Sequence, residues 1–159
     1  ATSGSAEKCQ YCLEQGASMV INYNEESFVE PILAATQGVG VNVIMDIAGG
    51  DFINENLKAI ATDGRMVSVA MQRGPQANVD IFRIMAKRVV WTGSTLRPQS
   101  VANKAQIAQG LAQQIWPLLN SGDINIPIDS IFPFSQVVQA HELMESGKHK
   151  GKIVLDLLA

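Results

Sequence analysis

The chain has 159 residues, enough for one ordinary domain; 47% of them are hydrophobic and 17% are charged, as in a globular protein. Twelve basic and fifteen acidic residues give a net charge of −3, and no basic stripe stands out, so we expect no general nucleic-acid or membrane-surface binding. No apolar run reaches the roughly 18 residues of a membrane span, and no signal peptide is visible, so we expect a soluble protein.

Helical and strand-like hydrophobic periods alternate along the chain. The expected helices are residues 6–15, 25–37, 52–60, 81–86, 101–120 and 135–146, and the expected strands are 19–23, 41–48, 65–70, 89–93, 128–134 and 152–157. This alternation predicts βαβ units and a parallel sheet. The strand at 41–48 is nearly continuously apolar, which is typical of a strand buried on both faces of such a sheet.

Three details qualify these elements. Pro31 falls inside the second helix, so we expect an irregular start there. Asp63 and Gly64 predict a turn before the strand that follows them. A cluster of Gly, Asp, Asn and Pro at 121–127 is the best candidate boundary, and it separates an α/β unit, residues 1–120, from a strand–helix–strand segment, residues 121–159.

The only cysteines, Cys9 and Cys12, lie three apart on the first expected helix. A structural zinc site would need two more ligands at suitable spacing, and no second Cys/His pair exists. A thioredoxin-type motif is the other alternative, but the surrounding sequence does not suggest one. We interpret them as ordinary reduced thiols, one facing the core, which favours a reducing compartment such as the cytoplasm.

A candidate anion site lies at the start of the first helix. Ser5 is its expected N-cap and Gly16 its carboxyl-terminal stop. Lys8 in the first turn opposes the helix dipole unless an anion binds there. NAD enzymes of the dinucleotide fold place Asp or Glu in this loop to hold the ribose, whereas here only Thr2, Ser3, Gly4 and Ser5 occupy it. The pattern therefore favours the 2′-phosphate of NADP, although a solvated surface lysine would also explain Lys8.

Further candidate residues follow other strands. Tyr23 ends its strand where an aromatic side chain could flank the same phosphate or the adenine, or could simply pack at the surface. Gly38 and Gly40 resemble part of a dinucleotide-binding glycine loop, but they follow a helix and precede a strand, the reverse of what that loop requires. Residues 49–50, 69–71 and 93–96 follow the carboxyl ends of three expected parallel strands, the edge on which ligands bind in open α/β sheets.

On these residues the sequence resembles the medium-chain dehydrogenase/reductase superfamily, specifically its zinc-independent NADPH:quinone oxidoreductase branch. The matching segments, in the family's order, are ATSGSAEK (1–8), GASMVINY (16–23), GVNVIMDIAGG (40–50), DGRMV (63–67), the helix around 141–145 and GKIVL (151–155). The resemblance implies a partial Rossmann-type α/β sheet that lacks its first strand, with residues 121–159 returning to the catalytic domain. It also implies hydride transfer from NADPH to a quinone or activated enone, without a metal.

The resemblance assigns roles by position. It places Gly4, Ser5 and Lys8 in the 2′-phosphate pocket with Tyr23 beside it, and Ile47 on the adenine side. The implied nicotinamide-side residues are Val69, Ala70, Met71, Gln72, Ser94, Thr95 and Leu96, and Lys150 lies in the tail that touches the cofactor. The family commonly forms homodimers by pairing its last strand, here Val89–Gly93, which is an apolar edge that pairing would protect.

We assign no catalytic residue, because His141 and His149 are better explained by packing and a solvated turn. Relative to the family, we expect the chain to be a fragment without the substrate-binding domain, the glycine loop and the central first strand. The third strand then has no natural neighbour on the fourth-strand side, and we expect little NADPH affinity and no turnover from the isolated chain. The alternatives are a non-catalytic α/β module that binds a nucleotide or a partner, an enoyl-thioester reductase, or a zinc alcohol dehydrogenase.

Overall fold

The computed structural model describes residues 1–158, and these form two compact units that divide after Pro98. The first unit is Ala1–Pro98 and the second begins at Gln99. This division by packing lies earlier in the chain than the expected boundary at 120–121. It concerns compactness alone, and the boundary between functional domains stays a prediction.

The first unit opens with β1 (Thr2–Ser3), α1 (Ala6–Glu14) and β2 (Ile21–Asn22). β1 and β2 pair in parallel, so the helix between them is a βαβ crossover. The expected caps of α1 are confirmed: the Ser5 side chain accepts a hydrogen bond from the Lys8 N–H, and Gly16 follows the helix with φ +96°. β2 is shorter than the expected strand at 19–23. Cys9 and Cys12 are unpaired, and both are half-buried instead of one facing the core.

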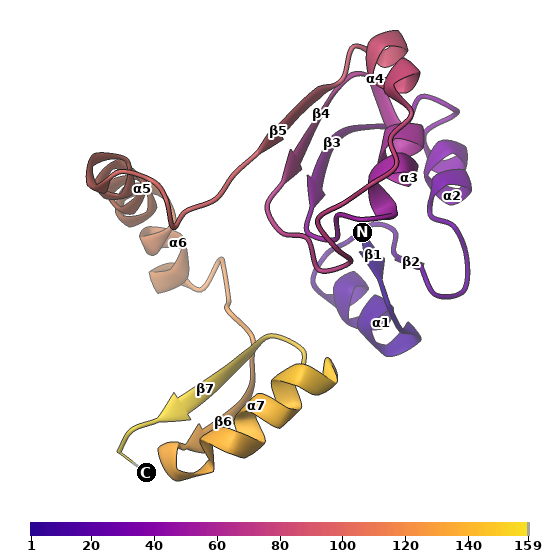
Figure 1. Ribbon diagram of the computed structural model, residues 1–159. Helices are drawn as coiled ribbons and strands as arrows, with labels where there is room; N and C mark the ends of the chain where they lie inside the picture. Colours follow the sequence, from indigo (N-terminus) through magenta and orange to yellow (C-terminus); the bar gives the residue numbers. More distant parts are fainter. Residues whose placement is uncertain (159) are drawn as a thin grey trace. The chain divides into compact units, whose positions relative to one another are not determined.

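A second, three-stranded sheet follows in the same unit (Figure 1). Its elements are α2 (Val29–Ala35), β3 (Val41–Asp46), α3 (Phe52–Ala59), β4 (Ile60–Ser68), α4 (Ile81–Lys87) and β5 (Val90–Gly93). The order is β3-β4-β5, with all pairs parallel, and no strand joins it to β1-β2 among the described residues. The two sheets match a 3-2-1-4-5-6 Rossmann order without the strand that lies between the second and the fourth. The expected α/β fold with parallel sheets is confirmed.

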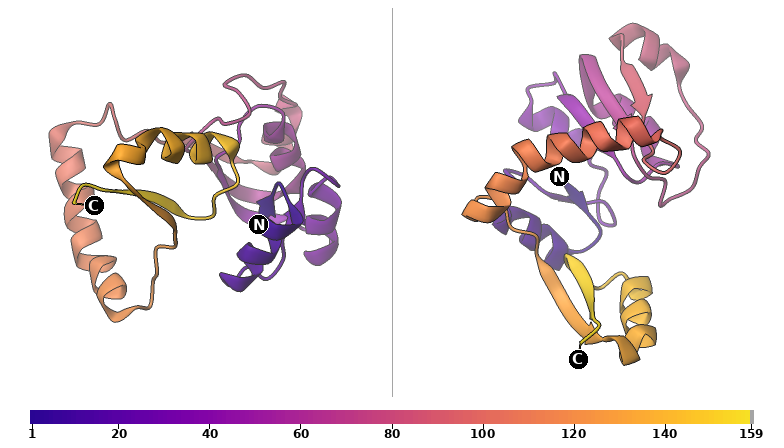
Figure 2. Two further views of the ribbon diagram at one scale, coloured as in Figure 1. Left: turned by 90° about the horizontal axis from the view of Figure 1, so that it is seen from below. Right: turned by 90° about the vertical axis from the view of Figure 1, so that its left-hand side faces the viewer.

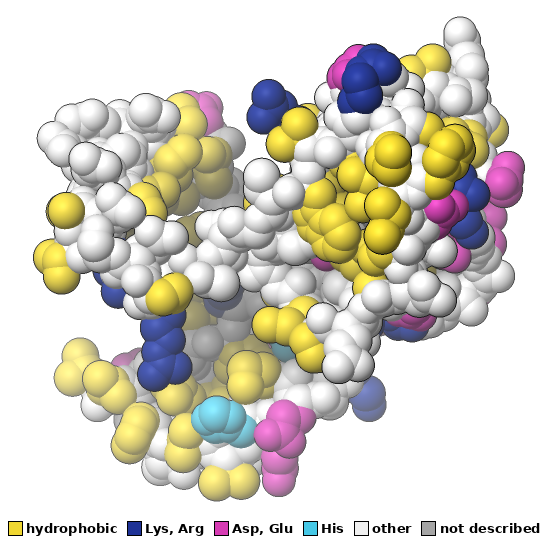
Figure 3. Space-filling model, turned by 45° about the horizontal axis from the view of Figure 1, so that its top comes forward, with side chains coloured by type: hydrophobic (Ala, Val, Ile, Leu, Met, Phe, Trp, Pro, Cys, Tyr) yellow, Lys and Arg dark blue, Asp and Glu magenta, His cyan; other side chains and the backbone are white. Residues whose placement is uncertain are grey.

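The core of the three-stranded sheet lies on one face only. Ile53 and Leu57 of α3 pack with Ile60 and Met66 of β4, and Ile44, Val79, Ile84 and Val89 surround them. The other face carries Val43 and Met45, which are 66% and 70% exposed. Hydrophobic side chains of the first unit are visible at its surface in Figure 3. Within this unit, the expectation that the strand at 41–48 is buried on both faces is therefore wrong.

Two elements of the first unit differ from the expectation for identifiable reasons. α2 begins only at Val29, which leaves Pro31 in its first turn, where a missing N–H costs no helical hydrogen bond. Asp63 and Gly64 were expected to form a turn before the strand, but they lie within β4. Asp63 has φ +60°, and the pairing of β3 with β4 shifts between Val41 and Val43, so the expected turn residues form an irregularity inside the ladder.

The second unit contains α5 (Val101–Gln114), α6 (Trp116–Ser121), β6 (Ile128–Pro133), a 3₁₀ turn (Phe134–Gln136), α7 (Val137–Ser146) and β7 (Lys152–Asp156). A single helix at 101–120 was expected, but Pro117 cannot donate to the carbonyl of Gln113, so the helix breaks at Ile115. β6 and β7 pair in parallel with α7 packed against both, which confirms the strand–helix–strand pattern (Figure 2). No helix among residues 1–158 has the length and apolar character needed to cross a membrane.

Candidate functional site

The first part of the candidate site is the turn between β1 and α1. Ser5 has an extended backbone, and its Oγ lies 3.2 Å from the backbone nitrogen of Lys8, the third residue of the helix. This bond satisfies one of the amide groups that a helix start leaves without an intrahelical partner. The same turn places the Lys8 side chain at the positive end of the helix dipole. Two sources of positive potential therefore combine at this point.

Gly4 and Tyr23 lie directly against each other in this turn. A β-carbon added at Gly4 would lie 2.6 Å from Tyr23 Oη, so the phenol occupies the space that a side chain would fill. Gly4 does not have positive φ, so the position requires glycine for space and not for backbone conformation. The contact is reinforced because Tyr23 N–H donates to Ser3 O at 3.0 Å and Asn24 Nδ2 donates to Gly4 O at 2.8 Å. We call Gly4, Ser5, Lys8 and Tyr23 the α1 corner.

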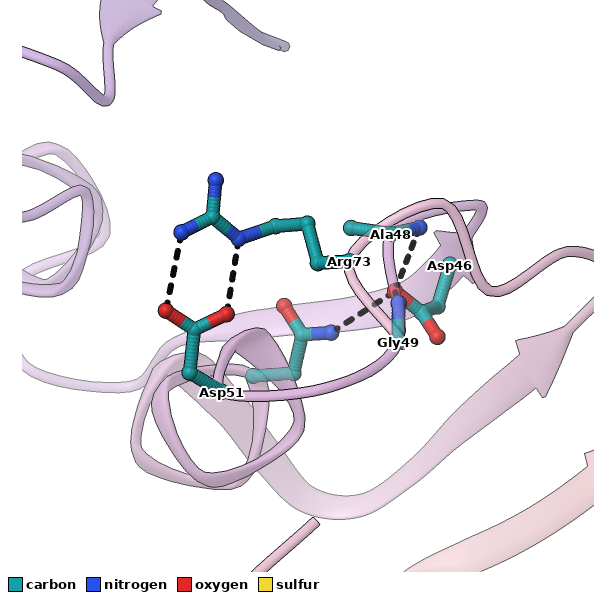
Figure 4. Close-up of polar contacts among 6 residues, drawn as sticks. Asp46, Ala48, Gly49, Asp51 and Arg73 are labelled. Carbon is teal, nitrogen blue, oxygen red and sulfur yellow. Dashed lines mark hydrogen bonds and ion pairs between the residues drawn. The ribbon is translucent and has the colours of Figure 1, made fainter. Parts of the chain in front are cut away.

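The second part of the site is the carboxyl end of β3, which is organised by the buried Asp46. Its Oδ1 accepts hydrogen bonds from the backbone N–H groups of Ala48 and Gly49 at 3.2 and 3.1 Å, and from Asn56 Nδ2 at 3.4 Å (Figure 4). Its Oδ2 accepts a bond from Ser68 Oγ of β4 at 3.2 Å. Asp46 is 3% exposed, so these bonds replace the water that the carboxylate would otherwise need.

The loops after β3 and β4 are joined through their backbones. Arg73 N–H donates to Ala48 O at 2.8 Å, and Gly50 N–H donates to Gly74 O at 3.1 Å. Gly50 has φ +53°, and a β-carbon there would lie 2.6 Å from Arg73 O. Both the backbone conformation and the close approach therefore require glycine. We call residues 46–51 and 68–74 together the β3–β4 edge.

An ion pair closes the outer side of this edge. Arg73 Nε and Nη2 donate to the two carboxylate oxygens of Asp51 at 2.7 and 2.9 Å (Figure 4). The hydrogen bonds from Arg73 hold the pKa of Asp51 below its ordinary value, and Asp51 raises the pKa of Arg73 in return. Both side chains are substantially exposed, so solvent screens the pair. The main effect of the pair is on geometry: its two parallel hydrogen bonds fix the plane of the guanidinium.

Aromatic contacts connect the β3–β4 edge with the α1 corner. The guanidinium carbon of Arg73 lies 4.6 Å from the centre of the Phe52 ring and 6.0 Å from that of Tyr23. The rings of Tyr23 and Phe52 meet edge to face at 5.1 Å, an arrangement that aromatic pairs favour. The Phe28 ring also packs against Phe52, with ring centroids 5.3 Å apart.

A cavity of about 350 Å³ opens beside these contacts. It is lined by Tyr23, Asn24, Glu25, Glu26, Ser27, Asp51, Phe52, Glu55 and Arg73. Its volume is within the range of small-ligand sites. Four of the lining residues are carboxylates and only one is a cation, so this cavity repels a phosphate. An anion is favoured instead at the α1 corner, where Lys8 and the start of α1 supply positive potential.

The structure brings most of the residues predicted from sequence to these two places. Gly4, Ser5, Lys8 and Tyr23 form the α1 corner, and the β3–β4 edge contains Ile47, Val69, Ala70, Met71 and Gln72. The remaining predicted residues of the first unit, Ser94, Thr95 and Leu96, follow the carboxyl end of β5. Val69 N–H donates to Asp46 O, and Ser94 N–H donates to Ser68 O, so the three strand ends adjoin. Lys150 belongs to the second unit, where its N–H donates to Asp129 Oδ1 at 2.8 Å.

Sequence reasoning missed Asp46 and the Arg73–Asp51 pair. Asp46 carried a usable signal, because a lone carboxylate in an apolar strand must find donors when it is buried. Arg73 carried none, because its partner is 22 residues away and the pairing depends on how two loops meet.

Comparison with known proteins gives consistent matches over nearly the whole chain. The sequence profile of the zinc-binding dehydrogenase family matches residues 15–155. Quinone oxidoreductase-like protein 2 of Bos taurus is 30% identical over 157 residues, which are 99% of this chain and 45% of that protein. The crystal structure of Escherichia coli quinone oxidoreductase complexed with NADPH has a TM-score of 0.81 and 28% identity, covering 97% of this chain and 48% of that one.

A putative alcohol dehydrogenase from Sinorhizobium meliloti 1021 is equally similar in fold. Its TM-score is 0.81 at 28% identity, and the match covers 98% of this chain and 42% of that one. The chain thus spans less than half the length of each of these three proteins.

Proposed function

Since the chain belongs to the zinc-binding dehydrogenase family, we propose that it carries the NADP(H)-binding part of an oxidoreductase that reduces a quinone or an activated enone. The resemblance to medium-chain dehydrogenases/reductases of the quinone oxidoreductase type is confirmed by the family match and the similar proteins. The quinone or enone as acceptor is the finer part of the proposal, and it rests on that similarity together with the chemistry of the α1 corner.

The α1 corner is the observation that carries the choice of cofactor. It combines a capped helix start, the ammonium of Lys8 and the hydroxyl groups of Ser5 and Tyr23, and no carboxylate follows β1 in the turn before Ala6. A 2′-phosphate needs cations and donors, whereas the free 2′-hydroxyl of NAD is held by Asp or Glu. The residues present therefore fit NADP(H) better than NAD(H).

Each part of the first unit then has a role in the proposal. The α1 corner would hold the 2′-phosphate, and the strand ends at Ile47, Val69–Gln72 and Ser94–Leu96 would line the path of the cofactor toward the substrate. When bound, NADPH supplies the hydride that reduces the acceptor. Lys150 would contact the cofactor from the second unit.

The name of the family implies a zinc ion. Among residues 1–158, no group of three His, Cys, Asp or Glu side chains is placed to hold a metal ion. The described residues therefore do not fit a zinc site. An alcohol dehydrogenase is the second candidate because of the similarity to the putative alcohol dehydrogenase of S. meliloti.

The proposal extends to assembly and location. β5 is the edge strand of its sheet, and Val90 and Trp91 on it are exposed, so a homodimer formed through Val89–Gly93 would protect an apolar edge. The two unpaired cysteines suit a reducing compartment such as the cytoplasm.

The cofactor assignment is tested by Lys8→Ala in the whole protein. Because a hydrogen bond to a charged group contributes about 1.5–3 kcal/mol, NADPH affinity should fall about tenfold to a hundredfold while NADH affinity changes little. Fluorescence titration with both cofactors measures this. Equal loss for both would overturn the phosphate assignment. Reduction of a quinone and enone panel, against an alcohol panel, separates the two acceptor classes. NADPH binding without turnover on either panel would favour a non-catalytic module.

A further inference from the structure

Tyr23 is held by two contacts in the first unit. Its hydroxyl lies against Gly4, and its ring meets the Phe52 ring edge to face at an interplanar angle of 78°. The contact with Gly4 limits how close the phenol comes to the turn before α1. The ring contact sets the direction from which it comes. The second contact depends on Phe52 staying in place.

Arg73 is the group that covers Phe52. Its guanidinium lies over the ring at 4.6 Å, and the side chain cannot easily move away because Asp51 holds it with two parallel bonds. The backbone of Arg73 is fixed as well, by its bond to Ala48 O and by the close packing of Gly50 against its carbonyl. The arginine thus transmits the rigid geometry of the β3–β4 edge to an aromatic ring beside the α1 corner.

We propose that Arg73 is a positioning residue for cofactor choice: through Phe52 it orients Tyr23 at the α1 corner, and it thereby strengthens the preference for NADPH over NADH without touching the 2′-phosphate. The inference rests on the proposed function, because it assumes that the corner binds that phosphate. It adds a determinant on the loop after β4, far in sequence from the corner that it serves.

A direct contact between Arg73 and the phosphate is the competing explanation, and the surroundings disfavour it. The charge of Arg73 is already matched by Asp51, and the cavity beside it carries Glu25, Glu26 and Glu55 as well. An anion entering there would meet more negative than positive charge. What Arg73 offers in this place is a planar group fixed over a ring.

The test is Arg73→Ala in the whole protein, with NADPH and NADH dissociation constants measured by fluorescence titration. Because an aromatic or cation–π contact contributes modestly, we expect the NADPH-to-NADH affinity ratio to fall about threefold to tenfold, with KM for NADPH rising and kcat nearly unchanged. Arg73→Lys keeps the charge but loses the planar fork, so it should not restore the ratio. Rescue by lysine would overturn the positioning role in favour of a direct charge contact.

Arg88→Ala is the matched control. Arg88 makes the same two-bond pair with an exposed aspartate, Asp63, at 2.7 and 2.6 Å, but it contacts neither Phe52 nor Tyr23 in any interaction that the structure describes. Its loss should leave the affinity ratio unchanged. A fall equal to that of Arg73→Ala would overturn the inference, because the effect would then come from losing any surface pair. Circular dichroism of each variant verifies that it is folded.

A double-mutant cycle separates the two roles of Arg73. If it acts through Tyr23, then Arg73→Ala should lower the ratio no further in a Tyr23→Phe background. Full additivity would overturn the inference while leaving the cofactor assignment intact. If the unmutated protein itself fails to prefer NADPH, the proposed function fails instead, so the two failures are distinguishable.

Discussion

The α1 corner and the β3–β4 edge lie in the same unit, yet they are built in opposite ways. The edge is made of backbone hydrogen bonds, glycines with no room for a side chain, and one buried carboxylate with four donors. The corner is made of the turn before α1, one side chain of that helix, Lys8, and the Tyr23 phenol, and α1 itself has no buried residue. The edge can hold its shape through its own bonds, whereas the corner depends on what lies against it.

Substitutions in the two regions should therefore have different effects. A change at the edge should act first on stability, because it leaves buried groups without partners. A change at the corner should act first on which cofactor binds, because few buried contacts depend on those side chains. Arg73 lies between the two, since its backbone belongs to the edge while its side chain faces the rings beside the corner.

The largest effect is expected for Asp46→Ala. Removing the carboxylate leaves the Ala48 and Gly49 N–H groups, the Asn56 amide and the Ser68 hydroxyl without their acceptor, so the free energy of unfolding should fall by about 3–5 kcal/mol. Urea unfolding measures it. Asp46→Asn keeps one acceptor oxygen and should lose less. A change below about 1 kcal/mol for the alanine variant would show that the edge does not depend on this residue.

An intermediate effect is expected for Gly4→Ala at the corner. The new methyl group would push the Tyr23 hydroxyl away, so NADPH affinity should fall about twofold to tenfold, because the hydrogen bond from Tyr23 to the phosphate would be weakened but not fully lost. Stability should change little, because the phenol can move and Gly4 does not have positive φ.

Gly110→Ala is the control for that substitution. Gly110 lies within α5 with open space around it, so alanine there should stabilise the helix slightly and leave NADPH affinity as it was. A loss of folding in Gly4→Ala, or an unchanged affinity for NADPH, would remove the distinction drawn between corner and edge.

The smallest effect is expected from acid titration of Asp51. Its folded-state pKa is lowered from 3.8, so its contribution to stability is fully present above that pH and is lost as the pH falls through the depressed value. Because the pair is exposed, the difference in Tm between wild type and Asp51→Asn should be about 2 °C or less at neutral pH. This difference in Tm should shrink in strong acid, where Asp51 is protonated. A difference that grows as the pH falls would contradict the assigned sign.

The sequence allowed much of this architecture to be predicted, because its main signals are local. The hydrophobic periods indicated the parallel βαβ pattern, and Ser5 and Gly16 marked the ends of α1 correctly. The break of the helix at Ile115 also has a local cause, Pro117, which the prediction of a single helix over 101–120 left out.

The features that sequence reasoning missed depend on contacts between distant segments. Asp46 receives its donors from the following loop, from α3 and from β4, and no local pattern fixes that set. The Arg73–Asp51 pair exists because two loops meet at one end of a sheet. The candidate residues at the corner were found from sequence because they lie within a few positions of one strand end, with Tyr23 following the neighbouring strand.

The most direct test of the account is the affinity of the unmutated whole protein for NADPH and NADH, measured in parallel by fluorescence titration at one ionic strength. A corner built for a 2′-phosphate predicts that NADPH binds at least about tenfold more tightly, as expected for charge-assisted hydrogen bonds. The preference should weaken as salt screens the phosphate. Equal affinities, or tighter binding of NADH, would contradict the assignment of the α1 corner as the binding site of the 2′-phosphate.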